Sequence, residues 1–370
     1  MARPEPLAPR TLHVAVVGLE FGSAFVPLYR DHPGVGAVTV CDLDADRVHG
    51  VQERDGIARG RTDLSEVLAD PTVDAVHIVT GIADHAGHVV RALEAGKHVA
   101  SAVPMALSFE DLDRIVAARV GSGRRYMMME TAAYTREYLY TAELVRSGTM
   151  GEIAYARGTH FQDMTGWPAY WRGLPPMHYA THAVAPILRM LDARASRVRA
   201  LGSGTLRFED QGDYRNPFAF ETALIELADH PAVVEIARAL YGFAHTPVES
   251  FSIYGERQSF EWAQLAGENP VLHEMGPATG GRGRPVAAHR VRPPDADHLL
   301  PVQLRGRARE AHGGSHPHLV HEFVSSVLED RAPAIDDRTA ANWTATGIAA
   351  HLSAMRGGDA VTIPTFGHRV

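Results

Sequence analysis

The chain has 370 residues, of which 45% are hydrophobic, and a formal net charge of −8 at pH 7. This length exceeds one ordinary hydrophobic core and predicts two domains. An acidic balance without a block of basic residues gives no electrostatic footprint for nucleic acid. We therefore expect no nucleic-acid partner and a small-molecule substrate.

Cysteine content and hydropathy indicate the cellular compartment of the protein. Cys41 is the only cysteine, so no intramolecular disulfide can form, which is typical of a reducing compartment. The first ten residues lack the apolar segment of a signal peptide, and no stretch reaches the roughly 18 uninterrupted apolar residues of a membrane helix. We expect a cytoplasmic protein that has no membrane partner.

Short apolar strands alternate with helices in the first third of the chain. Strands are predicted at residues 12–17, 38–41, 75–80, 98–100 and 126–129, and helices at 84–95 and 109–118. Such alternation predicts a parallel sheet that is covered on both faces. We place an α/β Rossmann domain at residues 1–125.

The pattern then changes to successive strands with little helix between them. These predicted strands are 153–160, 197–202, 223–227, 233–239 and 251–254. They indicate an α+β domain with an open-faced, mostly antiparallel sheet over residues 126–370. Residues 267–314 are rich in Pro, Gly, Arg and His, and we interpret them as a long loop or covering segment. Helical spacing returns at 319–328 and 340–355, which we expect to pack back on the body of the protein.

The turn after the first strand has the composition of a dinucleotide site. Gly18 and Gly22 lie where a strand meets a helix, so backbone N–H groups and the helix dipole can hold a diphosphate. Glu20 stands where the G-x-G-x-x-G pattern has its second glycine, with Phe21 beside it. Asp42 ends the second strand, where a carboxylate binds the adenosine ribose and repels the extra phosphate of NADP. We predict NAD as the cofactor, the alternative being a turn with a purely structural role.

Further cofactor contacts are expected where the parallel strands end, since ligands of doubly wound folds bind there. The residues that we assign to this edge are Thr80, His85, Pro104 and Glu130.

One segment carries a family resemblance. Residues 92–99 (ALEAGKHV), followed by Pro104, resemble the Gfo/Idh/MocA oxidoreductases, which pair a Rossmann domain with an open-faced antiparallel sheet. In that family the tripeptide before the substrate domain usually reads Glu-Lys-Pro, and its lysine lies near the reacting carbon and the nicotinamide. Here the tripeptide is Ala102-Val103-Pro104, and the missing lysine argues against simple polyol oxidation.

Four further segments resemble one branch of that family, the NAD-dependent glycoside hydrolases typified by α-N-acetylgalactosaminidases, in which a valine likewise precedes the proline. The segments are residues 128–134, 158–163, 178–186 and 312–314. The resemblance implies a redox-neutral cycle on a sugar or glycoside. A hydride leaves carbon 3, the aglycone is eliminated from carbon 1, water adds, and the hydride returns.

The same resemblance implies that Tyr179, His182 and Glu130 are the catalytic residues. His182 corresponds to the catalytic histidine of the family, and Tyr179 lies three residues earlier, on the same face of a helix. A positive nicotinamide and an imidazole partner would favour a Tyr179 phenolate as a base. The alternative is a structural pair that bridges helix to sheet through hydrogen bonds.

Several residues are candidates for the sugar pocket. Aromatic rings stack on sugar C–H faces, and a guanidinium suits a carboxylate or sulfonate, which makes an anionic glycoside such as a sulfoquinovoside a candidate. The same aromatic and arginine residues could instead form a subunit interface. The assigned residues are Tyr134, His160, Asp163, Trp167, Trp171, Arg172, His178 and His312.

The histidines at 312, 316, 318 and 321 do not lead us to predict a metal, because no carboxylate stands at ligand spacing. Two other functions stay open: an NAD-dependent sugar or polyol dehydrogenase that releases NADH, and a non-catalytic NAD-binding sensor. The family also leads us to expect a homo-oligomer, either a dimer or a tetramer.

Overall fold

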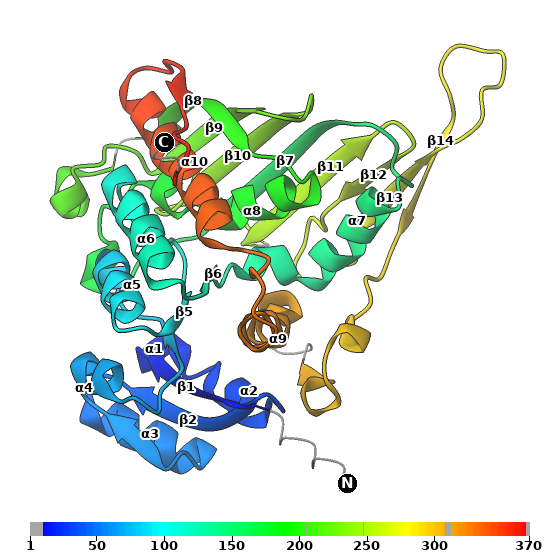
Figure 1. The fold of residues 1–370 in the computed structure, drawn as a ribbon. Coiled ribbons are helices and arrows are strands. Elements are labelled where there is room, and N and C mark those ends of the chain that lie inside the picture. Colours follow the sequence, from blue (N-terminus) through cyan, green and yellow to red (C-terminus); the bar gives the residue numbers. More distant parts are fainter. Residues whose placement is uncertain (1–9, 205, 247, 308–311, 368–370) are drawn as a thin grey trace, which may run out of the picture.

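The computed structural model describes residues 10–204, 206–246, 248–307 and 312–367. Its N-terminal part is built on a six-stranded sheet in the order β3-β2-β1-β4-β5-β6, in which every neighbouring pair is parallel (Figure 1). The strands are β1 (Leu12–Val17), β2 (Val35–Cys41), β3 (Arg59–Arg61), β4 (Ala75–Ile78), β5 (His98–Ser101) and β6 (Tyr126–Met128). The helices are α1 (Leu19–Gly22), α2 (Val26–Asp31), α3 (Ala45–Asp55), α4 (Leu64–Ala69), α5 (His85–Glu94) and α6 (Phe109–Ser122).

The strand order of this sheet locates a ligand site. All residues of β1 and β4 are buried, as expected for central strands with helices on both faces. The order reverses between β1 and β4, and ligands of doubly wound folds bind outside the carboxyl ends of the strands at such a point. The sheet also includes β6, so it continues past the boundary that we expected at residue 125, because residues 126–128 pair with β5.

The second sheet has nine strands in the order β14-β13-β12-β11-β7-β10-β9-β8-β15. Only β7 and β10 pair in parallel among its described strands; the other pairs are antiparallel, which confirms the expected fold class. The strands are β7 (Ile153–Phe161), β8 (Ala195–Ser203), β9 (Phe220–Leu227), β10 (Val233–Ala239), β11 (Glu249–Gly255), β12 (Gln258–Glu261), β13 (Val271–Met275), β14 (Val286–Arg290) and β15 (Val361–Thr362).

Four helices belong to this part of the chain: α7 (Arg136–Arg146), α8 (Thr181–Met190), α9 (Ser315–Leu328) and α10 (Asp337–Met355). Helix α8 packs on β7 and α10 packs on β8, and the two helices contact each other, so they cover the same face of the sheet (Figure 1). Helix α10 also contacts α6, and α9 contacts α2. The C-terminal helices therefore contact both the nine-stranded sheet and helices of the N-terminal domain.

The prediction of a long loop at residues 267–314 is wrong in part. Strands β13 and β14 form a hairpin that projects from the edge of the sheet (Figure 1). All five residues of β14 are exposed, so no alternation of apolar and polar residues marks the strand in the sequence. Residues 308–311 of the segment lie outside the described residues.

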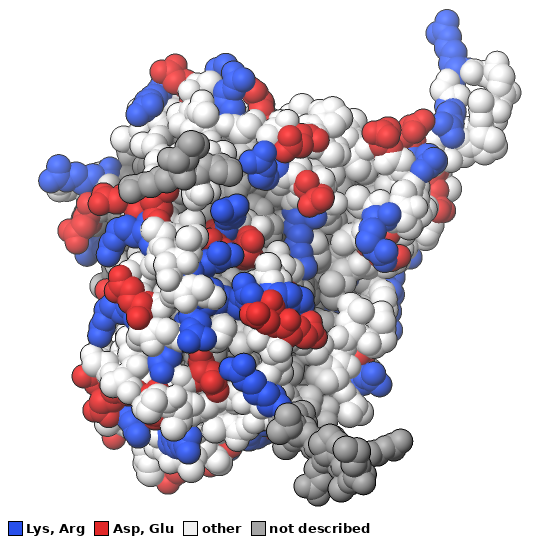
Figure 2. Space-filling view, in the orientation of Figure 1, with Lys and Arg blue, Asp and Glu red and all other residues white. Residues whose placement is uncertain are grey.

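Positive and negative side chains are intermixed on the face of the molecule shown in Figure 2. Among the described residues, no helix combines the length and hydropathy needed to span a bilayer.

A substitution at Gly158 can test the close packing of α8 against β7. A Cβ atom at this glycine would lie 2.1 Å from the carbonyl oxygen of Ala183, next to His182. Gly158→Ala must therefore displace the helix, and we expect it to lower the free energy of unfolding by about 1–3 kcal/mol, the usual cost of overpacking. In urea unfolding, the control Gly50→Ala in α3, where a Cβ meets nothing within 4 Å, should instead raise stability by roughly 0.5–1 kcal/mol. Equal stability of Gly158→Ala and the wild type would contradict the close packing.

Candidate active site

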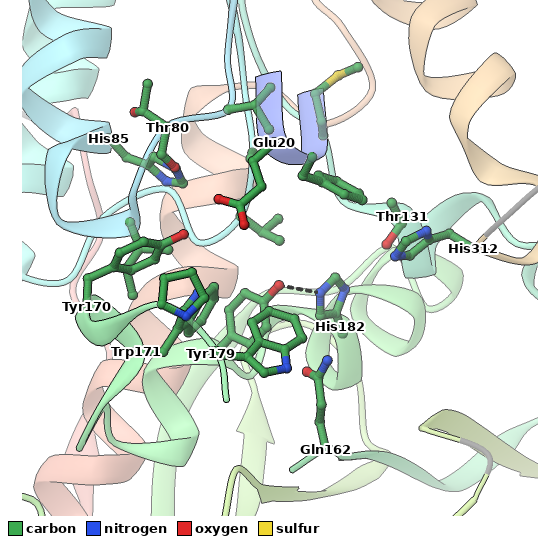
Figure 3. Close-up of a pocket in the computed structure, with 18 of the residues that line it drawn as sticks. Glu20, Thr80, His85, Thr131, Gln162, Tyr170, Trp171, Tyr179, His182 and His312 are labelled. Atoms are coloured by element: carbon green, nitrogen blue, oxygen red, sulfur yellow. Dashed lines mark hydrogen bonds between the residues drawn. The ribbon is translucent and has the colours of Figure 1, made fainter. Parts of the chain in front are cut away.

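A cavity of about 650 Å³ lies between the two sheets (Figure 3). One wall comes from α1 and from the segments that follow β4 and β5. The opposite wall comes from β7, the 3-10 turn Ala169–Trp171, the start of α8 and the start of β11. The cavity therefore stands at the carboxyl edge of the parallel sheet, where the sequence places the cofactor.

Three polar side chains form a hydrogen-bonded chain along this cavity. Glu130 follows β6 and is fully buried, and its Oε1 lies 2.6 Å from Nδ1 of His182. Nε2 of the same imidazole lies 3.2 Å from the Tyr179 hydroxyl, the contact drawn as a dashed line in Figure 3. Tyr179 ends a 3-10 turn and His182 is the second residue of α8, so the tight connection between these two elements brings both side chains together.

The partners of His182 determine which of its nitrogens carries the proton. An ionised carboxylate only accepts hydrogen bonds, so Nδ1–H donates to Glu130 and the lone pair of Nε2 faces Tyr179. Burial lowers the pKa of His182, but the charge and hydrogen bond of Glu130, together with the charge of Glu249, outweigh burial and raise it above its usual 6.5. The arrangement has the logic of a Ser-His-Asp triad, with a phenol in place of the serine.

Tyr179 itself is a neutral phenol in this environment. Burial raises its pKa far above 10, the charges of Glu130 and Glu249 raise it further, and the guanidinium of Arg238 lowers it only in part. Free phenolate is therefore disfavoured, in contrast to the expectation from the sequence. The phenol can still accept a proton if it passes its own proton to Nε2 of His182 in the same step.

Arg238 supports this group from beneath. It is fully buried on β10 and donates to the backbone carbonyls of Tyr179, His160 and Ala239 at 2.9, 2.7 and 2.7 Å. Its guanidinium carbon lies 5.1 Å from the centre of the Tyr179 ring. Arg238 thus holds the backbone that carries Tyr179 and places a positive charge against its ring.

Residues of the N-terminal domain form the cofactor side of the cavity. Gly18 has φ +88°, and a Cβ there would lie 2.4 Å from the carbonyl oxygen of Val79, so only glycine fits this turn. His85 lies 2.8 Å from the Pro104 carbonyl and 3.0 Å from the Thr80 carbonyl, so it ties together the segments after β4 and β5. This tight turn and the joined wall leave open space in front of α1, which fits a dinucleotide.

Two carboxylates on this side have different surroundings. Asp42 accepts a hydrogen bond from the backbone N–H of Leu19 at 2.7 Å and forms an ion pair with Arg47 at 3.2 Å. It thus stabilises the turn between β1 and α1 and stands at the end of β2, where the sequence predicts the ribose contact. Glu20 instead points into the cavity (Figure 3). A negative charge at the diphosphate turn opposes an anionic cofactor, while the backbone of the turn is unaffected by this side chain.

The structure brings most of the predicted site residues to the cavity. Beside Tyr179 and His182, the predicted residues that line it are Glu20, Phe21, Thr80, His85, His160, Trp167, Trp171 and His312. Gly18, Gly22, Asp42, Pro104 and Glu130 are not among the lining residues, and they lie in the segments that support the walls.

Two predicted sugar contacts point elsewhere because strand and loop geometry direct them away. Asp163 accepts hydrogen bonds from Thr165 and Gly242 and so stabilises a turn, while its neighbour Gln162 faces the cavity. Arg172 donates to the backbone carbonyl of Glu209 and does not line the cavity.

Two others pack against side chains away from the cavity. The Tyr134 ring lies 4.2 Å from the guanidinium of Arg189, which in turn donates to the Ala133 carbonyl. His178 packs its ring against His351 at 5.2 Å, and burial lowers the pKa of His178 to about 3. Neither residue lines the cavity.

Sequence reasoning missed Gln162 and Glu249, both of which line the cavity. Gln162 stands two residues after His160 in an extended segment, so alternation along the chain could have identified it. No motif marks Glu249, because its place depends on strand pairing. Among the described residues, no group of three or more His, Cys, Asp or Glu side chains is arranged to hold a metal ion.

Glu20→Gly should strengthen NAD binding, because it removes a negative charge from the diphosphate turn. We expect the dissociation constant to fall by a factor of about 2 to 5, since exposed charge contacts contribute roughly 0.2–1 kcal/mol. Titration calorimetry with NAD measures this directly, and Glu20→Gln should give a similar gain. The exposed Glu94→Gln is the control. Weaker binding by both Glu20 variants would show instead that the carboxylate contacts the cofactor favourably.

Glu130→Gln should alter the pH dependence of any turnover. Nε2 of His182 must be unprotonated to accept a proton, so activity is lost as the pH falls through the raised pKa of His182. Without the carboxylate the pKa drops, and the acid limb of the kcat/KM profile moves to lower pH. The rate on the plateau should fall by about 100-fold or more, because an amide cannot fix the tautomer. An acid limb that stays in place would contradict the pairing; the exposed Glu143→Gln is the control.

Comparison with known proteins agrees with this architecture. Residues 12–130 match the family model described as the oxidoreductase family with an NAD-binding Rossmann fold, GFO_IDH_MocA. A glycosyl hydrolase family 109 protein of Porphyromonas gingivalis is 28% identical over 211 residues, 52% of this chain and 45% of the relative. A glycosyl hydrolase family 109 protein 1 of Bacteroides thetaiotaomicron is 26% identical with the same coverage. The chain thus matches less than half the length of these relatives.

Among solved structures, levoglucosan dehydrogenase in complex with NADH and levoglucosan superimposes with a TM-score of 0.80. The match covers 96% of this chain and 100% of that structure at 20% identity, so it shows the shared two-domain fold. The predicted cofactor agrees with the description of the family model. Residues 12–130 of this chain therefore form a Rossmann domain of the NAD-binding type found in the Gfo/Idh/MocA family.

Proposed function

We propose that this protein is an NAD-dependent glycoside hydrolase that acts by transient oxidation at carbon 3 of a sugar. The observation that carries the proposal is the wall of the cavity at Val103, where the family resemblance places a lysine. The only lysine of the sequence, Lys97, donates to the backbone carbonyls of Asp70 and Val73 and does not line the cavity. Proton handling therefore falls to Tyr179, His182 and Glu130.

The chain's own residues can carry the proton of the reacting hydroxyl. NAD, when bound, supplies the acceptor for the hydride of carbon 3 and returns it at the end of the cycle. Tyr179 receives the hydroxyl proton at Oη while its own proton moves to Nε2 of His182. Glu130 stabilises the resulting imidazolium through Nδ1. The reverse movement restores the hydroxyl, so the same three residues serve both half-reactions.

The lining of the cavity favours a neutral sugar. Trp167, Tyr170 and Trp171 present aromatic rings along one side, suited to sugar C–H faces. No Lys or Arg is among the lining residues of the described chain. An anionic glycoside such as a sulfoquinovoside was predicted from Arg172, which the structure directs toward Glu209.

The names of the curated relatives support the hydrolase, and the solved sugar dehydrogenases of the same fold favour a second candidate, a dehydrogenase that releases NADH.

We also propose a homo-oligomer formed through the uncovered face of the nine-stranded sheet. Leu201, Leu224 and Val233 are exposed on its strands β8, β9 and β10.

The deciding experiment incubates the protein with α- and β-p-nitrophenyl glycosides, neutral, acetamido and sulfonated, with and without NAD. Nitrophenol release that needs NAD but accumulates no NADH is the result expected of the hydrolase, with neutral sugars preferred. NADH accumulation without nitrophenol release would establish the dehydrogenase. NAD binding without either product would favour the non-catalytic NAD-binding sensor.

Tyr179→Phe provides the site-directed test. Loss of the hydroxyl should lower the rate by about 10²- to 10⁴-fold, as expected for a positioned proton carrier, with the NAD dissociation constant unchanged. Tyr155→Phe, on β7 outside the cavity lining, is the control. Normal hydrolysis by Tyr179→Phe would disprove the assignment.

A further inference from the structure

Three neighbouring strands of the second sheet place ionisable side chains in register beneath the cavity. Arg238 on β10 pairs with His160 on β7, and His160 pairs with Glu249 on β11. Residues directly opposite each other on paired strands point to the same face of a sheet. Glu249 therefore emerges on the face covered by α8, and it lines the cavity together with His160.

The Glu249 carboxylate is close to the hydrogen-bonded chain without being its hydrogen-bonded partner. Its Oε2 lies 4.0 Å from Nδ1 of His182, beyond hydrogen-bond distance, while Oε1 of Glu130 lies 2.6 Å from the same nitrogen. Glu130 also accepts the backbone N–H of Ala132 at 3.0 Å. Glu130 is thus committed as an acceptor, and Glu249 presents a second carboxyl group to the cavity.

The surroundings of Glu249 favour its protonated form. Burial raises the pKa of this carboxyl, the negative charges of Glu130 and Glu137 raise it further, and His182 and Arg238 oppose the shift only in part. Two carboxyl groups whose environments differ in this way can divide acceptor and donor roles.

We propose that Glu249 is a catalytic acid that protonates the departing aglycone, an inference that rests on the proposed glycosidase function. After oxidation at carbon 3, the carbon 2 proton passes to a water molecule, and the electron pair left on carbon 2 forms the C1=C2 bond. The C1–O bond breaks, its electron pair goes to the glycosidic oxygen, and that oxygen takes the proton of Glu249. In the second half the Glu249 carboxylate takes a proton from the water whose oxygen bonds to carbon 1, and carbon 2 takes back a proton from the water that accepted it in the first half.

Leaving-group dependence separates this role from a structural one. Glu249→Gln should lower kcat/KM for a methyl glycoside by about 10²-fold or more, the range for general acid catalysis. It should change kcat/KM for the matching p-nitrophenyl glycoside by less than about fivefold, because nitrophenolate departs without a proton. NAD affinity and the exchange of the carbon 2 hydrogen with deuterium oxide, followed by NMR, should be retained. Glu249→Asp should recover part of the methyl glycoside activity, and Glu226→Gln on β9 is the control.

Each outcome is distinguishable. Equal losses on both glycosides, or loss of the carbon 2 exchange, would overturn the assignment of Glu249 as the acid. Absence of aglycone release by the wild type from either glycoside would instead defeat the proposed function. Loss of NAD affinity in Glu249→Gln, without recovery in Glu249→Asp, would show a structural role and would also overturn the inference.

Discussion

The hydrogen bond between Glu130 and His182 is the interaction on which the candidate site depends. Glu130 follows the last strand of the parallel sheet, whereas His182 lies in the helix that covers the second sheet. The bond of 2.6 Å joins two domains, and both partners are buried. It holds the proton of the imidazole on Nδ1, which leaves Nε2 free to accept the proton of Tyr179 in the proposed mechanism. In the proposed mechanism, proton transfer therefore requires that the two domains are docked.

Burial changes how the tyrosine can act. A sequence motif suggests a phenolate, because tyrosine, imidazole and a cationic cofactor stand together. The structure shows that the same residues are so enclosed that an isolated negative charge on the phenol is costly, as for any buried ion. A neutral relay avoids that cost, since the charge appears on the imidazole beside a carboxylate. Arg238 serves the relay by holding backbone carbonyls in place.

Local sequence signals predicted the elements with strong periodicity. The strand at residues 233–239 was predicted with its observed bounds, and the motif around Tyr179 and His182 was sufficient to pair them. Asp163 was predicted as a sugar contact, but its side chain points away from the cavity and accepts a hydrogen bond from the backbone of Gly242. Its neighbour Gln162 faces the cavity instead. Glu249 could not be predicted, because its contact with His182 spans 67 residues and arises from the pairing of β7 with β11. Strand β14 could not be predicted either, because an exposed strand has no buried face to leave a pattern.

The charge of the cavity wall determines how the binding of an anionic ligand depends on ionic strength. The exposed carboxylate of Glu20 lines the cavity, and no Lys or Arg is among the lining residues of the described chain. An anionic ligand that approaches this wall meets repulsion, and dissolved salt screens a repulsion as effectively as an attraction. Salt therefore favours loading of the cavity, the opposite of its effect on the cation-lined sites that usually receive phosphates.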